Sequence, residues 1–187
     1  MKKFAVFYSG FGRGAKEIIN DYKNGYILPE LSLVFTTNPD TEAFQIAKEL
    51  KIPVLSLNKK QFDSNEDFEK EIVKVLIFHK IDYIFLAGYG LLIGDVLLSQ
   101  FMSKIVNIHP SLLPSFTGHK NGLQQALDYG VKIVGITTHV VNEGMDSGKI
   151  LFQESIEVED NDFKQLEYRI FKIGTILQVK TINKYFI

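Results

Sequence analysis

Short apolar runs alternate with amphipathic stretches along the first half of the chain. The runs read as strands buried on both faces and cover residues 4–8, 31–36, 53–57, 83–87 and 105–108. The stretches between them place apolar residues at helical spacing, as at Phe68, Ile72 and Leu76. Strand–helix–strand units of this length predict a parallel sheet with right-handed crossovers.

Several helix starts carry recognisable capping residues. A helix is expected from Asn38 to about Leu50, with Asn38 as its cap and Pro39 in its first turn. Ser64 and Asp67 form a capping-box arrangement ahead of a long helix that begins at residue 65. Two shorter helices are expected over residues 15–22 and 123–129.

The pattern changes after residue 129. Residues 132–141 and 149–158 are rich in β-branched side chains and flank a glycine-bearing loop around Asp146, so they predict an antiparallel pair. A final helix from Asp162 has an apolar face made of Phe163, Leu166, Ile170, Ile173 and Leu177. We expect one α/β domain over residues 1–187: a mostly parallel sheet with helices on both faces and antiparallel C-terminal strands.

Composition narrows the possible functions. Hydrophobic residues make up 45% of the chain and charged residues 23%, which is typical of a folded domain. The 21 basic and 22 acidic side chains form no block of one sign, so neither nucleic acid nor an anionic membrane is an expected partner. The chain has no cysteine, and its four histidines have no close carboxylate spacing, so we expect no metal site. A soluble, cytoplasmic protein is expected, because no apolar segment reaches the roughly 20 residues that span a bilayer.

The most informative segment is residues 107–114, at the end of the fifth strand. Asn107 and His109 are two residues apart, so their side chains share one face of the strand, and Pro110 and Pro114 stiffen the backbone beside them. A carboxylate from a later loop would complete an acid–base device suited to attack on a carbonyl. A structural hydrogen-bonded pair remains the alternative. His139 lies among β-branched residues, where packing near the site is expected rather than chemistry.

Two other loops leave the carboxyl ends of predicted strands, where ligands bind in open parallel sheets. Residues 9–14 are rich in glycine and open a helix, so they could hold a phosphate or simply make a tight turn. Residues 87–93 combine glycine with Leu91, Leu92 and Ile93, which suits a flat heteroaromatic ring but also the start of a core helix.

The motif at residues 107–114, followed by Asp146, resembles the folate-dependent formyltransferases, and most closely the members that act on glycinamide ribonucleotide (GAR). The resemblance also includes residues 86–89, 125–127, 135–140 and 142–148. It implies a Rossmann-like fold, the formyl donor 10-formyltetrahydrofolate as co-substrate, GAR as acceptor, and direct transfer without a metal. Both partners are small molecules.

The same resemblance assigns roles to individual residues. Catalysis falls to Asn107, His109 and Asp146. The acceptor phosphate would lie on Gly12, Arg13 and Gly14, and Pro110 would contact the acceptor. The pterin would lie between two segments: Leu91, Leu92 and Ile93 on one side, and Val141, Asn142, Glu143 and Gly144 on the other.

Three departures from the family pattern concern the acceptor. The family usually has Ser-Asn at Arg13-Gly14 and a Gly-Pro-Ile sequence at residues 148–150, and a Glu-His pair in the last helix aligns with Gly174-Thr175. Two alternatives therefore stay open: a formyltransferase for another amine, such as an amino sugar nucleotide, and a non-catalytic folate- or nucleotide-binding relative. The sequence also leaves open whether the protein is a monomer or a homodimer.

Overall fold

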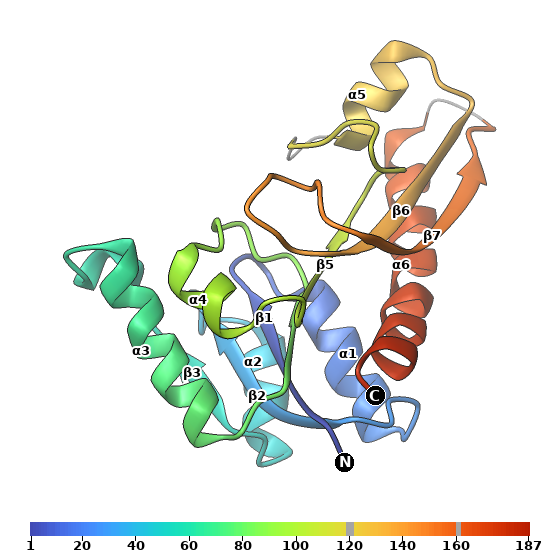
Figure 1. Cartoon of the computed structure of the whole chain (residues 1–187). Helices are drawn as coiled ribbons and strands as arrows, with labels where there is room; N and C mark the ends of the chain where they lie inside the picture. The colour runs from blue at the N-terminus through green and yellow to red at the C-terminus, as the bar shows by residue number, and fades with distance from the viewer. Residues whose placement is uncertain (119–121, 160–161) are drawn as a thin grey trace.

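One sheet of seven strands, in the order β3-β2-β1-β4-β5-β6-β7, organises the molecule (Figure 1). The computed structural model describes residues 1–118, 122–159 and 162–187. The strands are β1 (Lys3–Tyr8), β2 (Glu30–Thr36), β3 (Val54–Ser56), β4 (Tyr83–Leu86), β5 (Ile105–His109), β6 (Ile133–Val140) and β7 (Ile150–Glu157). The helices are α1 (Arg13–Lys23), α2 (Glu42–Glu49), α3 (Asn65–Phe78), α4 (Asp95–Gln100), α5 (Gly122–Tyr129) and α6 (Phe163–Tyr185), with a short 3₁₀ turn at Lys59–Gln61.

The strand directions confirm the predicted sheet. The first five strands are parallel, while β6 runs antiparallel to β5, and β7 antiparallel to β6. Strand order reverses at β1, which lies between β2 and β4, so α1 after β1 and α4 after β4 cover opposite faces of the sheet. Ligands of open parallel sheets bind at such a point, beyond the carboxyl ends of the strands. This continuous sheet agrees with one domain over residues 1–187, which stays a prediction.

Helices cover both faces of the sheet because side chains alternate along each buried strand. Phe4, Val6 and Tyr8 of β1 pack in a cluster with residues of α1, α2 and the end of α6. Ala5 and Phe7 point the other way, into a cluster with α3 and α4. A third cluster joins α5 and the first half of α6 to β6. Figure 1 shows α6 running along this side of the sheet from β7 to α1.

The two predicted caps had different outcomes. Ser64 caps α3 as expected, since its Oγ accepts a hydrogen bond from the Asp67 N–H at 3.0 Å. The predicted start at Asn38 is wrong: α2 begins at Glu42, and Thr41 is its cap. The Asn38 side chain instead accepts from the Asp40 N–H and donates to the carbonyl of Gly10, which ties this turn to the loop after β1.

The core helix that residues 87–93 were expected to start, as one of two alternatives, is α4, which begins later, at Asp95. Its six residues are too few to show a period. Its start is held from a distance by the buried carboxylate of Glu69 in α3. That carboxylate accepts from the N–H of Gly94 at 2.6 Å and from the N–H of Leu97 at 3.2 Å. A cap supplied by another helix leaves no local signal in the sequence.

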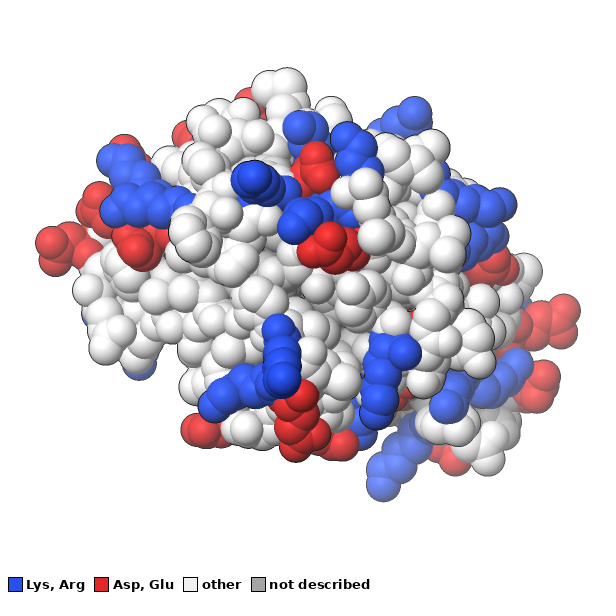
Figure 2. All heavy atoms as spheres, turned by 90° about the horizontal axis from the view of Figure 1, so that it is seen from below, with Lys and Arg blue, Asp and Glu red and all other residues white. Residues whose placement is uncertain are grey.

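The surface matches the balanced composition. On the face shown in Figure 2, Lys and Arg side chains lie among Asp and Glu rather than in a separate patch. No helix within the described ranges has the length and apolar character needed to cross a membrane.

Candidate active site

The strand β5 presents Asn107 and His109 side by side at its carboxyl end. Its antiparallel neighbour β6 sets His139 opposite Asn107 and Thr137 opposite His109. His109 and His139 are both buried. Two imidazoles are thus buried at the carboxyl end of β5, and buried polar groups need hydrogen-bond partners.

Asp146 comes from the loop between β6 and β7 and reaches both histidines. Its Oδ2 atom lies 3.4 Å from His109 Nδ1, and its Oδ1 atom lies 3.5 Å from His139 Nε2. The Gly118 N–H donates to the same Oδ2 at 2.9 Å. Asp146 also has a φ of 50°, in the left-handed region that few residues other than glycine adopt. The structure therefore brings the three predicted catalytic side chains together at one point.

His109 is flanked by oxygen acceptors at both ring nitrogens. Nε2 lies 3.3 Å from the carbonyl oxygen of Phe116, to which it can only donate. Nδ1 faces the carboxylate of Asp146. Both ring nitrogens of His109 therefore face an oxygen that can accept a hydrogen bond.

His139 is held in its neutral state. Its Nδ1 lies 3.1 Å from the carbonyl oxygen of Val140 and so carries the proton, which leaves Nε2 to accept from Asn107 Nδ2 at 3.2 Å. Burial lowers the pKa of His139 below its usual value, more than Asp146 raises it. The neutral ring thereby fixes the orientation of the Asn107 amide. From the sequence we expected His139 only to pack near the site; the antiparallel pairing of β6 with β5 is the signal that places it opposite Asn107.

Hydrogen bonds from the neighbouring strands hold the turn after β5. The Thr137 hydroxyl donates to the carbonyl of Ser111 at 2.7 Å and accepts from the Leu113 N–H at 3.1 Å. Gln153 of β7 donates to the carbonyl of Leu113 at 3.0 Å. The backbone that follows Asn107 and His109 is therefore held by β6 and β7.

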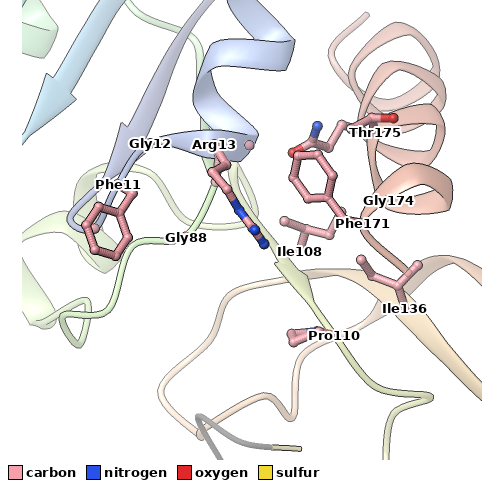
Figure 3. A pocket seen from close by; sticks show the side chains of 14 residues that line it. Phe11, Gly12, Arg13, Gly88, Ile108, Pro110, Ile136, Phe171, Gly174 and Thr175 are labelled. Atoms are coloured by element: carbon pink, nitrogen blue, oxygen red, sulfur yellow. The ribbon is translucent and has the colours of Figure 1, made fainter. Parts of the chain in front are cut away.

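A cavity of about 350 Å³ opens between α1, β5 and α6, where Ile108 and Pro110 form part of its wall (Figure 3). It is lined by Gly10, Phe11, Gly12, Arg13, Gly14, Ala87, Gly88, Ile108, Pro110, Ile136, Phe171, Gly174, Thr175 and Gln178. The residues predicted to contact the acceptor, Gly12, Arg13, Gly14 and Pro110, are all among them. This cavity, which we call the acceptor cavity after that prediction, lies at the amino end of α1, where backbone N–H groups favour an anion.

Arg13 separates the acceptor cavity from a second cavity of about 480 Å³. Its guanidinium lies 4.9 Å above the ring of Phe171, and its Nη2 lies 3.3 Å from Glu167 Oε1. Both cavities share Arg13, Phe171, Pro110 and Ile136 as walls. Figure 3 shows the Arg13 side chain reaching from the start of α1 toward Ile108 and Pro110.

Glu167 was missed from the sequence. The alignment with the family's Glu-His pair at Gly174-Thr175 pointed to a pocket without a carboxylate. Gly174 is in fact packed closely, since an added Cβ would lie 2.8 Å from Ile136 Cδ1. About two turns earlier on α6, Glu167 lines the second cavity and pairs with Arg13. The site therefore has a carboxylate.

The predicted folate-binding residues lie on the two loops at the other side of β5. Leu91, Ile93 and Val141 pack against the cluster of α3 and α4, while Leu92 is 72% exposed. Asn142 accepts from the Gly144 N–H at 3.2 Å, which turns the loop, and Glu143 is exposed. These seven residues line neither of the two cavities described above, and their role stays a prediction.

The chain has two other histidines, and its His, Asp and Glu side chains are its possible metal-binding groups. His79 ends α3 as its C-cap residue, and His119 lies outside the described residues. Within residues 1–118, 122–159 and 162–187, no three His, Asp or Glu side chains are grouped so as to hold a metal ion.

Comparison with known proteins places these features in a family. A family model described as "Formyl transferase" matches residues 2–182. The phosphoribosylglycinamide formyltransferase of Bacillus subtilis (strain 168) is 40% identical over 174 residues, covering 92% of this chain and 89% of that protein. The crystal structure of the enzyme of that name from Bacillus halodurans is 39% identical, with a TM-score of 0.92 over 98% of this chain and 94% of that chain. Glycinamide ribonucleotide transformylase 1 from Geobacillus kaustophilus is 37% identical, with a TM-score of 0.92 over 98% and 97% of the two chains.

Proposed function

The chain belongs to the formyl transferase family, and from that premise we propose that it transfers the formyl group of 10-formyltetrahydrofolate to the primary amine of GAR, in purine biosynthesis. The observation that carries this proposal is the meeting of His109 with Asp146, to which Asn107 is connected through His139. The names of the relatives at 40% and 39% identity support GAR as the acceptor.

The reaction forms a C–N bond between the acceptor nitrogen and the formyl carbon. A tetrahedral intermediate arises with a negative oxygen and a positive nitrogen. The bond from the formyl carbon to N10 of the folate then breaks, and the proton lost by the amine ends on N10. Catalysis requires a donor to the oxyanion and a path for that proton.

Asn107 is the proposed donor to the oxyanion. One N–H of its Nδ2 is directed to His139, and we assign the other to the reacting oxygen. A donor of this kind is typically worth about 10²–10³-fold in turnover. Because the orientation is fixed before the substrate arrives, no reorganisation is needed in the transition state.

His109 and Asp146 are the proposed acid–base pair. Cationic His109 stabilises the oxyanion by its charge and supplies or relays a proton between the amine and N10. Asp146 holds the ring through Nδ1 and favours its charged form. Assistance of this type contributes roughly 10²–10⁴-fold.

The two substrates approach from opposite sides of β5. GAR would place its phosphate at the start of α1 and its amine near Pro110, in the acceptor cavity. The pterin would lie against Leu91, Leu92 and Ile93 and the loop that begins at Val141, an apolar wall with exposed main chain. The proposed transfer requires no metal. We infer that the enzyme is cytoplasmic and that both of its substrates are small molecules.

The direct test is an assay of the purified chain with GAR and 10-formyltetrahydrofolate. Formyl-GAR and tetrahydrofolate should appear in equal amounts. Failure to form product while the folate binds would refute the proposal and favour a non-catalytic relative. Faster turnover with an amino sugar nucleotide than with GAR would instead reassign the acceptor, which the changes at Arg13 and Gly14 make worth testing.

A further inference from the structure

Gln178 lies on the buried side of α6 and ends at the wall of the acceptor cavity. The residue is 3% exposed, and a Cβ atom added at Gly14 would lie 3.2 Å from its Oε1 atom. Gly14, Ala87 and Gln178 all line the cavity. The absence of a side chain at Gly14 thus leaves the room that this carboxamide occupies.

The NH₂ end of the Gln178 amide is not paired. Its Nε2 atom is buried without a hydrogen-bond partner, and it is the one such side-chain atom within the described residues. An unpaired buried amide destabilises a fold, so most buried polar atoms in proteins have partners. Its buried neighbour on α6, Thr181, does have them, in Thr138 and the carbonyl of Leu177. Packing alone would favour an apolar side chain at Gln178.

The first turn of α1, beside Gln178, has no side-chain cap that would compete with a ligand for its N–H groups. Gly12 is the N-cap residue and offers no side chain, and the first turn contains no acidic residue. The Lys16 N–H donates to the carbonyl of Gly12, so the N–H groups of Arg13 and Gly14 precede the first helical bond. An anion there meets the positive end of the helix dipole.

We propose that Gln178 recognises the phosphate of the acceptor together with the start of α1, an inference that rests on the proposed function. The O and NH₂ ends of an amide have nearly the same shape. A 180° rotation of the Gln178 amide therefore exchanges its O and NH₂ ends with little movement of other atoms. The rotation breaks no hydrogen bond of Nε2, because Nε2 has none. The NH₂ group then faces the cavity at Gly14 and donates to a phosphate oxygen held by the backbone N–H groups of α1.

The first test compares two acceptors in the variant Gln178→Leu. The KM for GAR should rise about tenfold, or about 1.4 kcal/mol, with kcat unchanged. The KM for the dephosphorylated acceptor, glycinamide ribonucleoside, should not change. Gln165→Leu, on the exposed side of the same helix, is the matched control and should leave both constants unchanged. An unchanged KM for GAR, or an equal rise for both acceptors, would overturn the assignment.

The second test does not depend on catalysis. Inorganic phosphate binding is measured by calorimetry for the wild type, Gln178→Leu and Gln178→Glu. Leucine should weaken binding about tenfold and glutamate more, because its carboxylate repels the anion. Glutamate keeps the size of the side chain and serves if the leucine variant is unstable. Phosphate binding equal to wild type in the glutamate variant, or no binding to the wild type, contradicts the inference. A wild type that binds phosphate through Gln178 yet formylates no GAR refutes only the proposed function.

Discussion

The Nδ2 atom of Asn107 lies 3.2 Å from the Nε2 atom of His139, so the imidazole determines which end of the amide faces it. The Val140 carbonyl fixes the His139 proton on Nδ1. Protonation of Nε2 would reverse the arrangement, because an N–H there repels the NH₂ of Asn107 and is drawn to Asp146 at 3.5 Å. The proposed oxyanion donor is therefore oriented only while His139 is neutral.

Asp146→Asn should lower turnover while leaving the affinity for both substrates nearly unchanged. The amide keeps the shape of the carboxylate but loses the charge that favours cationic His109. We expect a fall of about 10²-fold or more in kcat, measured under saturating GAR and folate. Asp128→Asn, on α5, is the control and should behave as wild type. A turnover in Asp146→Asn within a factor of two of wild type would exclude the assigned role.

Acidification should cost stability through His139. The pKa of this buried ring is lowered from its ordinary value of 6.5, so the unfolded chain binds the proton more readily than the native one. This part of the stability is present above pH 6.5 and is lost as pH falls from there toward the lowered native pKa. Urea unfolding between pH 4.5 and 7.5 measures this loss of unfolding free energy. The range extends about two units below and one unit above the ordinary pKa of 6.5.

The variant His139→Gln provides the comparison. Glutamine does not titrate, so the dependence of stability on pH in this window should become shallower. Its carboxamide oxygen can still accept from Asn107, so part of the turnover should remain. An unchanged pH dependence would mean that His139 is not the group responsible.

Arg13→Ala should weaken the binding of GAR without weakening the fold. The Arg13 side chain is 62% exposed and its partner Glu167 is exposed too, so the free energy of unfolding should change by about 0.5 kcal/mol or less. The KM for GAR should rise about tenfold at low salt and less at high salt, because salt screens the attraction to the phosphate. Lys23→Ala, at the far end of α1, should leave the KM unchanged. A KM independent of both Arg13 and salt would remove this residue from phosphate binding.

Glu69→Gln should destabilise the chain and weaken folate binding. An amide can replace one of the two acceptor oxygens at Gly94 and Leu97, but its NH₂ group would face the other backbone N–H. We expect a loss of about 1–3 kcal/mol in urea unfolding and a higher KM for the folate, since Leu91–Ile93 precede the helix that Glu69 holds. Glu71→Gln, whose exposed partner is Lys74, should change stability little. Equal effects of the two variants would contradict this role for Glu69.

The sequence predicted the parts of the site that depend on local pattern. Five apolar runs gave the parallel strands, and the spacing of Asn107 and His109 gave their shared face. Asp146 came from the family resemblance and not from spacing, because nothing local says where a loop between two strands will reach. The structure supplied the distance of 3.4 Å that connects it to His109.

Contacts between distant elements were beyond sequence reasoning. His139 meets Asn107 only through the pairing of β5 with β6, and Glu69 caps α4 from another helix. In the sequence, Gln178 is one polar residue among the apolar residues of its helix. Only the structure shows that Gly14 of α1 leaves room for its carboxamide. Thr41 replaced Asn38 as the cap of α2 because Asn38 is already engaged in the preceding turn.

The most direct measurement is the rate of a single turnover with GAR in Asn107→Ala, taken together with the Kd of the folate. The account predicts a rate about 10²–10³-fold below wild type and an unchanged Kd, because the amide acts on the oxyanion and not on the bound donor. A rate equal to wild type would show that the oxyanion is stabilised elsewhere and would contradict the mechanism.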